Sequence, residues 1–177
     1  MINEFTLHPK PTNINAKIAF LVSLSVFAFL TVTYMVMDLY KGVIGLGAMV
    51  FLTVAIMFYT RYISAEYYYE VLFANGVPMF IVKQRVGKRV TTLSSVALSD
   101  IREVLVQNSQ QRRQHKCEVG YRKYFYSPTL SPETTLLLKV SSRYEKSEIR
   151  IEGTPELAKT LEEYANEARL LSADDEE

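Results

Sequence analysis

At 177 residues, the chain is long enough for one ordinary domain, or for a membrane anchor followed by a modest domain. Its 20 Lys and Arg nearly balance its 19 Asp and Glu, so the overall charge of +1 indicates no class of charged partner. The single cysteine, Cys117, excludes an intramolecular disulfide and a CxxC zinc or redox motif, and it favours a reducing compartment.

The N-terminal third is much more apolar than the remainder. Residues 18–37 and 42–60 are runs of 20 and 19 uncharged residues, whereas residues 61–177 contain 17 Lys and Arg and 17 Asp and Glu. A 20-residue helix is about 30 Å long, which matches the hydrocarbon core of a bilayer. Because backbone amides in lipid must be satisfied within the segment, the two runs predict a transmembrane helical hairpin over residues 17–62.

Two other interpretations of these runs are less favourable. A signal peptide has an apolar core of about 7 to 15 residues and a small-x-small cleavage site, whereas the first run is longer and is followed directly by a second. A buried hairpin of a soluble protein rarely contains apolar runs of spanning length.

The charges beside the runs predict an orientation. Lys10, Lys17 and Arg61 flank the outer ends of the hairpin, against Lys41 in its turn. The excess of positive charge places both termini in the cytoplasm. Interfacial aromatic residues are expected at both ends of the spans: Tyr34, Tyr40, Tyr59 and Tyr62.

Small residues recur three or four apart within the runs: Ala19, Ser23, Gly42, Gly45 and Ala48. Such faces permit close helix packing, either within the hairpin or between two copies of the chain. Neither run contains Asp, Glu, Lys, Arg or His, which usually mark ion paths and transport sites, so channel and transporter functions are not favoured.

The remaining sequence is typical of β-strands joined by turns. A polar leader over residues 1–16 is expected to be disordered or interfacial. Residues 107–116 lack any apolar side chain and predict a solvated loop. Ile101, Val104 and Val106 are the expected inward residues of their strand. Strands are predicted over residues 66–74, 77–84, 90–107 with a kink at 99–100, 117–126, 134–142 and 147–152.

A C-terminal amphipathic helix is predicted over residues 155–171 and is expected to cap the β domain. Thr154 is its N-cap, Pro155 occupies the first helical position and Glu156 lies near the positive end of the helix dipole. An acidic tail follows at 173–177. The apolar stripe consists of Leu157, Leu161, Tyr164, Ala165, Ala168 and Leu171.

The order of elements over residues 64–171 resembles the pleckstrin-homology-like (PH-like) fold, in the bacterial version in which helical spans precede the domain. The resemblance includes the turn at Asn75-Gly76 and the stretch from Leu98 to Ile101. It implies a membrane-anchored α+β protein of the bacterial plasma membrane, with a cytoplasmic, mostly antiparallel sandwich or barrel over residues 63–172. Members of this family are generally non-enzymatic modules that bind lipid, peptide or protein partners.

Few residues suggest chemistry. His115 and Cys117 are two soft metal ligands, but a zinc site needs three or four. Cys117 as a nucleophile would need a base, and the other histidine, His8, is distant in sequence. No phosphate-binding loop or nucleophile elbow is present, so we expect no enzymatic activity, cofactor or metal.

Charge is the strongest signal in the β domain. Residues 83–123 carry ten Lys and Arg against three acidic residues, and residues 145–177 carry eleven acidic against four basic residues. Beside an anionic leaflet each nearby Lys or Arg contributes about 1 kcal/mol. The alternatives are a solvated face or pairing with the acidic helix. The expected surface contacts are Lys88, Arg89, Arg112, Arg113 and Lys116.

Nucleic-acid binding would use the same basic segment, with Tyr121, Tyr124, Phe125 and Tyr126 as stacking platforms. These aromatic residues alternate like strand residues that fill a core, so we expect no nucleic-acid partner. The sequence instead favours a membrane-anchored, non-enzymatic scaffold or regulatory protein whose β domain binds a protein partner, membrane lipid or a second copy of the chain. The alternative is an accessory subunit of a larger membrane enzyme or transporter.

Overall fold

A computed structural model describes residues 2–9, 13–37, 40–142 and 145–174 of the chain. The chain forms two compact units. One is a helical hairpin made by residues 11–65, and the other is a β domain made by residues 1–10 and 66–177. The expected turn residue Asp38, the flanking Lys10 and the tail residues 175–177 lie outside the described residues.

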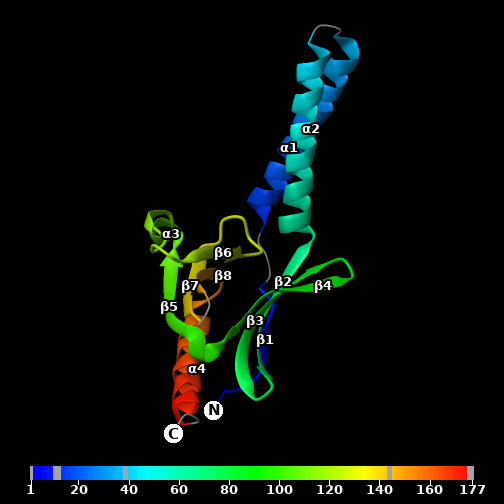
Figure 1. Cartoon of the computed structure of the whole chain (residues 1–177). Coiled ribbons are helices and arrows are strands. Elements are labelled where there is room, and N and C mark those ends of the chain that lie inside the picture. The colour runs from blue at the N-terminus through cyan, green and yellow to red at the C-terminus, as the bar shows by residue number, and fades with distance from the viewer. Residues whose placement is uncertain (1, 10–12, 38–39, 143–144, 175–177) are drawn as a thin grey trace. The chain divides into compact units, whose positions relative to one another are not determined.

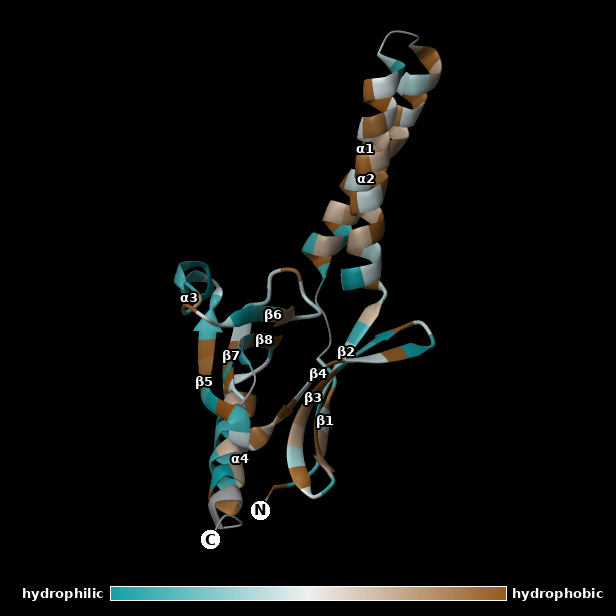
Figure 2. Ribbon diagram, in the orientation of Figure 1, coloured by the Kyte–Doolittle hydropathy of each residue, from teal (hydrophilic) through white to brown (hydrophobic). Residues whose placement is uncertain are grey.

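The hairpin consists of α1 (Ile14–Val36) and α2 (Lys41–Phe58), which continues as the π-helical turn η1 (Tyr59–Ile63). Both helices are long and apolar enough to span a membrane. Only 6% and 11% of their most apolar 18-residue windows are buried, whereas the core helix of a soluble protein would be mostly buried. The apolar colouring of the two helices is visible in Figure 2.

Small residues form much of the contact between α1 and α2. Ser23 and Ala48 are buried, and a Cβ atom on Gly45 would lie 3.4 Å from the Tyr34 ring. Gly42 has no neighbour within 4 Å of such a Cβ atom, so it is not part of this contact. The small residues of the sequence therefore divide between the packed seam and an open face.

The first sheet contains four strands in the order β1-β2-β3-β4: β1 (Phe5–Leu7), β2 (Ala65–Ala74), β3 (Val77–Val86) and β4 (Arg89–Ala97). Asn75 and Gly76 both have positive φ, as a type I′ hairpin turn requires, which explains the Asn-Gly signal. Gly87, with φ of 61°, begins the two-residue turn between β3 and β4. The N-terminal strand β1 lies inside the polar leader, residues 1–16, which was expected to be disordered or interfacial, so this part of the leader is ordered.

The second sheet has the order β5-β7-β8-β6: β5 (Ile101–Asn108), β6 (Arg122–Tyr126), β7 (Thr134–Ser141) and β8 (Lys146–Glu152). The short 3-10 helix η2 (Leu98–Asp100) connects it to the first sheet, at the predicted kink. The β6–β8 pair is parallel, so the sheet is mixed. The described strands form two separate sheets and no closed barrel.

Two expectations about β5 and the stretch that follows it were wrong. The polar stretch after β5 contains a short helix, α3 (Ser109–Gln114), because Asn108 and Gln111 form a reciprocal capping box at its N-terminus. Val106, expected to point inward, is 42% exposed, because β5 is an edge strand of its sheet. Ile101 is fully buried as predicted.

The C-terminal helix α4 (Pro155–Asp174) lies against η2 and β5 (Figure 1). Its first turn has the predicted cap, with the Leu157 N–H donating to Thr154 Oγ1 over 3.3 Å. Leu161 is fully buried in the core, whereas Leu171 is 52% exposed and lies outside it. The core is made mainly by Tyr69, Phe80, Leu98, Ile101, Leu136, Leu137, Leu138, Ile149, Ile151 and Leu161.

Candidate functional site

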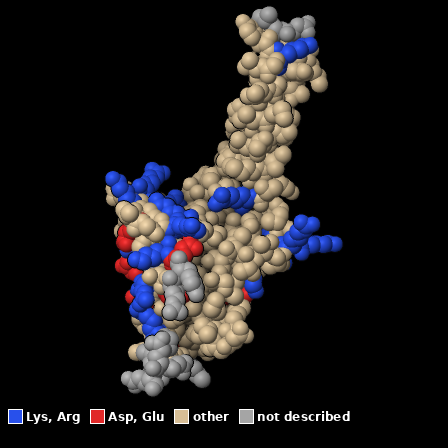
Figure 3. All heavy atoms as spheres, viewed as in Figure 1, with Lys and Arg blue, Asp and Glu red and all other residues tan. Residues whose placement is uncertain are grey.

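The five basic residues expected to contact a surface divide between two places. Lys88 and Arg89 lie at the turn between β3 and β4, and Arg112 and Arg113 lie on α3, with Lys116 just after it. Figure 1 shows this turn and α3 on opposite sides of the β domain. Figure 3 shows Lys and Arg gathered at both places, with acidic side chains among those on the α3 side. The structure therefore does not bring the five residues into one patch.

The turn between β3 and β4 is a protruding tip. All residues from Arg85 to Thr92 are exposed, including Val86 at 39% and Val90 at 58%. Arg85 forms an ion pair with Glu66 at the start of β2. Lys88 and Arg89 have no ion-pair partner among the residues that the structure describes. The tip thus combines two exposed apolar side chains with two positive charges that are available to a ligand.

The tip lies at one end of the first sheet. The two chain segments that connect this sheet to the apolar helices start at the same end. β2 starts at Ala65, directly after η1, and the Glu66–Arg85 pair fixes the end of β3 beside this start. β1 runs towards the same end, because Leu7 is paired with Tyr69 and His8 Nδ1 lies 3.0 Å from the Tyr67 carbonyl oxygen. Lys88 follows Arg85 by three residues, a reach of about 10 Å at most.

The residues on the α3 side differ in accessibility. Arg113 and Lys116 are exposed, but Arg112 is half-buried, with a buried Nη1 atom that has no hydrogen-bond partner among the described residues. Other basic residues of the segment 83–123 form ion pairs with carboxylates. Lys83 pairs with Glu70 at 2.5 Å, and Arg122 with Glu145 at 3.6 Å.

His115 and Cys117 surround a buried carboxylate and do not form a metal centre. Glu148 is fully buried, its Oε2 lies 3.1 Å from His115 Nε2, and its Oε1 accepts the Glu118 N–H over 3.3 Å. Burial opposes ionisation of Glu148, but these donors and the Cys117 thiol hold its pKa below the usual range. Burial and the neighbouring carboxylate raise the pKa of Cys117, which disfavours a reactive thiolate. Within the described ranges, no group of three or more His, Cys, Asp or Glu is arranged to hold a metal.

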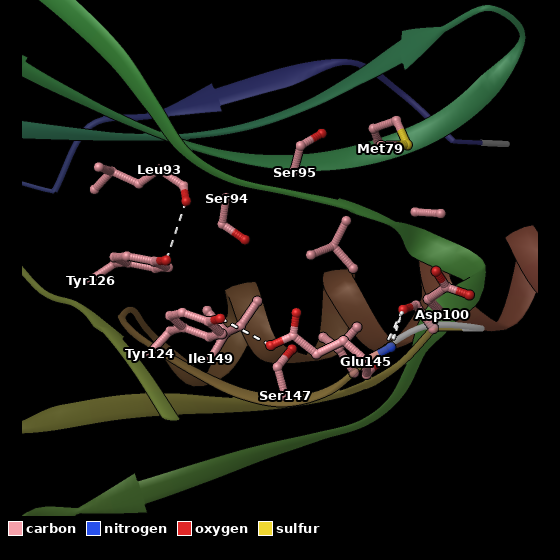
Figure 4. A pocket seen from close by; sticks show the side chains of 14 residues that line it. Met79, Leu93, Ser94, Ser95, Asp100, Tyr124, Tyr126, Glu145, Ser147 and Ile149 are labelled. Atoms are coloured by element: carbon pink, nitrogen blue, oxygen red, sulfur yellow. Dashed lines mark hydrogen bonds between the residues drawn. The ribbon is translucent and has the colours of Figure 1, made fainter. Parts of the chain in front are cut away.

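A pocket of about 390 Å³ opens between the two sheets. One wall is β4, from Leu93 to Ala97, and the opposite wall is formed by β6, β7 and β8 (Figure 4). At one end, Tyr126 donates a 3.2 Å hydrogen bond to the Leu93 carbonyl oxygen, across the gap between the sheets. η2 carries Asp100 at the other end.

The pocket wall is polar and acidic. Tyr124 donates a 2.9 Å hydrogen bond to Glu145 Oε1, and the Tyr124 and Tyr126 rings are stacked at 6.0 Å. Burial raises the pKa of Asp100, and the nearby Arg102 only partly opposes this. Within the part of the chain that the structure describes, no Lys, Arg or His lines the pocket. The lining residues are Met79, Leu93, Ser94, Ser95, Val96, Ala97, Asp100, Tyr124, Tyr126, Val140, Ser142, Glu145, Ser147 and Ile149.

This pocket was not predicted from the sequence. Its walls come from β3, β4, η2, β6, β7, β8 and the connection between β7 and β8, and most of its polar residues are ordinary Ser and Tyr of strands. The one available signal was Tyr124 and Tyr126, whose alternation indicated an inward face but not a cavity. Comparison of the chain with models of known families, with curated proteins and with solved structures finds no match. The fold and the site therefore define the protein only as an α+β chain with two apolar helices and a two-sheet domain.

Proposed function

We propose that the chain is an integral membrane protein, spanning the bilayer with α1 and α2, whose non-enzymatic β domain contacts the anionic surface of the leaflet and serves as a scaffold or regulatory module. The observation that carries this proposal is the place of the β3–β4 tip. Two exposed basic and two exposed apolar side chains project from the end of the first sheet that is joined to both apolar helices. Exposed valines favour the interface, and the cations favour anionic headgroups.

The pairing of β1 with β2 supports the topology. Residues before α1 and residues after α2 belong to one folded domain, so two spanning helices must leave that domain and return to it on the same side of the bilayer. The positive charges of Lys17 and Arg61 near these ends, against Lys41 in the turn, favour the cytoplasmic side.

We interpret the β domain as PH-like, in the bacterial plasma-membrane form. The order of strands, the kink at η2 and the C-terminal helix support this interpretation. The parallel β6–β8 pair and the two separate sheets depart from a closed antiparallel barrel.

The test uses the full chain in proteoliposomes. With Cys117→Ser as background, the fluorophore NBD is attached at Val90→Cys, and its emission and its quenching by lipid-borne nitroxide are measured. We expect a blue shift and strong quenching in vesicles that contain phosphatidylglycerol, and weaker effects in pure phosphatidylcholine, because Lys88 and Arg89 together contribute about 2 kcal/mol on an anionic surface.

The matched control is NBD at Val119→Cys, which is fully exposed on the loop before β6. Charge reversal of Lys88 and Arg89 to Glu should abolish the lipid dependence at Val90, and reversal of Arg113 and Lys116 should change it less. If Val90 and Val119 give the same water-like signal in both lipids, the tip does not contact the leaflet and the proposal is wrong.

A further inference from the structure

The inter-sheet pocket is separate from the basic tip and suggests a second binding activity. β4 ends the strand order of the first sheet, and β6 ends that of the second. An edge strand presents backbone N–H and C=O groups on its outer side, and an incoming extended chain can pair with them. The pocket lies along β4 at Ser94 to Ala97, so it is bounded by this strand edge and by the inner face of the second sheet.

A bulge shapes β4 at the end of the pocket where Tyr126 contacts Leu93. The pairing of β3 with β4 shifts between Val82 and Lys83, which leaves Leu93 as the extra residue of β4. The Leu93 carbonyl oxygen turns to the second sheet and accepts the hydrogen bond from Tyr126. Beyond this contact, β4 returns to regular pairing from Ser94 to Ala97. The strand is thus regular along the pocket and anchored at one end of it.

The lining chemistry favours a cation. Serine and tyrosine hydroxyl groups line the pocket together with the Asp100 and Glu145 carboxylates, and none of the described lining residues is Lys, Arg or His. Arg122, 3.6 Å from Glu145, and Arg102, near Asp100, are not among these lining residues and offset the two charges only in part. Figure 4 shows the Glu145 carboxylate directed towards Tyr124, which donates a hydrogen bond to it, and Asp100 at the η2 end of the pocket. An anionic ligand would meet like charge there, whereas an ammonium or guanidinium group would form charge-assisted hydrogen bonds.

We infer that the pocket binds an extended segment of a partner protein, which pairs with the edge of β4 and places a Lys or Arg side chain against Asp100 and Glu145. A volume of about 390 Å³ is at the small end for drug-sized ligands and suits a few residues of a peptide. The strand edge supplies main-chain hydrogen bonds, which give affinity, and the two carboxylates select the basic side chain. This site goes beyond contact with the leaflet and does not depend on it.

The probe is a panel of fluorescent decapeptides of alternating Thr and Val with one central Lys. The panel also contains matched peptides in which norleucine or Glu replaces Lys, and a Lys peptide with alternate backbone N-methyl groups. Binding to the full chain in nanodiscs is measured by fluorescence anisotropy. We expect about tenfold weaker binding with norleucine, still weaker binding with Glu, and loss of binding on N-methylation.

The variants separate the pocket from general charge effects. Asp100→Asn and Glu145→Gln remove the carboxylates and keep the side-chain shape, and each should weaken the Lys peptide about tenfold without changing the norleucine peptide. The matched control, Glu162→Gln with Glu163→Gln, neutralises two exposed carboxylates of α4 and should leave binding unchanged. Reversal of Lys88 and Arg89 should also leave it unchanged, which separates this site from the leaflet contact.

Amide hydrogen exchange provides a second measurement that does not depend on the variants. The Lys peptide should protect the amides of β4 from Ser94 to Ala97 and should not protect those of α4. If no Lys peptide binds, if norleucine binds equally well, or if Asp100→Asn with Glu145→Gln has no effect, the inference is overturned. If Ser95→Cys cross-links two copies of the chain through this edge instead, the occupant is a second copy and the partner segment is excluded.

Discussion

The helical hairpin and the β domain differ in where their large apolar side chains lie. In the hairpin, Phe29 is 68% exposed and Met35 77%, whereas Leu136, Leu137 and Leu138 of the β domain are fully buried. Apolar side chains on every face of a helix are stable when lipid is the solvent, and those of a sheet in water need partners from other strands. The hairpin is therefore specified by local composition, and the β domain by contacts between residues far apart in sequence.

The largest expected effect comes from the core of the β domain. Leu161→Ala removes a fully buried side chain of α4 and should lower the free energy of unfolding by about 2 to 5 kcal/mol. Urea denaturation of the full chain in detergent, followed by near-ultraviolet circular dichroism of Tyr, measures it. Leu170→Ala, 69% exposed on the same helix, is the control and should change stability by less than about 0.5 kcal/mol. Equal effects would contradict the placement of α4.

A charge introduced into the helical hairpin should change membrane insertion, and not the stability of the β domain. Val50→Arg places a cation on the exposed face of α2 and should disfavour insertion by about 2.5 to 3.5 kcal/mol. The fraction of chain that stays in the membrane pellet after alkaline extraction measures this effect. Val119→Arg on the β domain is the control and should leave the pellet fraction unchanged. An unchanged fraction for Val50→Arg would mean that α2 does not cross the bilayer.

A smaller effect is expected at the hydrogen bonds that connect the two sheets. Tyr69 Oη donates to the Tyr126 carbonyl oxygen over 2.7 Å and accepts the Glu152 N–H over 3.2 Å. Tyr69→Phe leaves both buried partners unsatisfied and should destabilise the β domain by about 1 to 3 kcal/mol. Tyr68→Phe on the neighbouring position, whose hydroxyl donates to the exposed Glu66, should cost less in the same denaturation assay.

The smallest effect expected is a pH dependence confined to the β domain. The pKa of Glu148 is lowered in the folded state, so its contribution to stability is present above the unfolded value of 4.5 and is lost as pH falls through the lower folded pKa. The change is small because burial offsets much of the gain from the hydrogen bonds. Melting temperatures of the full chain between pH 6 and pH 3 test it, and Glu148→Gln should flatten the curve; a curve equally steep in this variant would assign the effect to other groups.

Much of the order of elements was readable from local signals. Asn75-Gly76 predicted a hairpin turn because two positive φ angles in succession favour these residues. Thr154-Pro155 predicted the start of α4 because the Thr154 side chain caps the helix and Pro155 lacks the backbone N–H that would stay unpaired at the first helical position. The helix α3 was missed because its six polar residues have no apolar period, and a capping box alone defines it. The strand β1 was missed because three residues are too few to show a pattern.

The candidate sites were less predictable than the elements. The excess of positive charge over residues 83–123 was correct as a sum, but the sequence could not show that the turn between β3 and β4 and the helix α3 lie on opposite sides of the domain. The acidic character of the pocket depends on Asp100 of η2 and Glu145, just before β8, which are 45 positions apart in the sequence. They line one cavity only because the two sheets face each other.

The sequence by itself determined the two spanning-length helices, the β character of the remaining chain and the boundaries set by turns and caps, because each depends on residues within one or two turns of chain. Tertiary structure alone decided that β1, which precedes the hairpin in sequence, pairs with β2, which follows it. It also decided that β6 pairs in parallel with β8, and that two strand edges flank an acidic pocket. Strand pairing joins residues as far apart in sequence as Phe5 and Val71, and no local period encodes which edges remain unpaired.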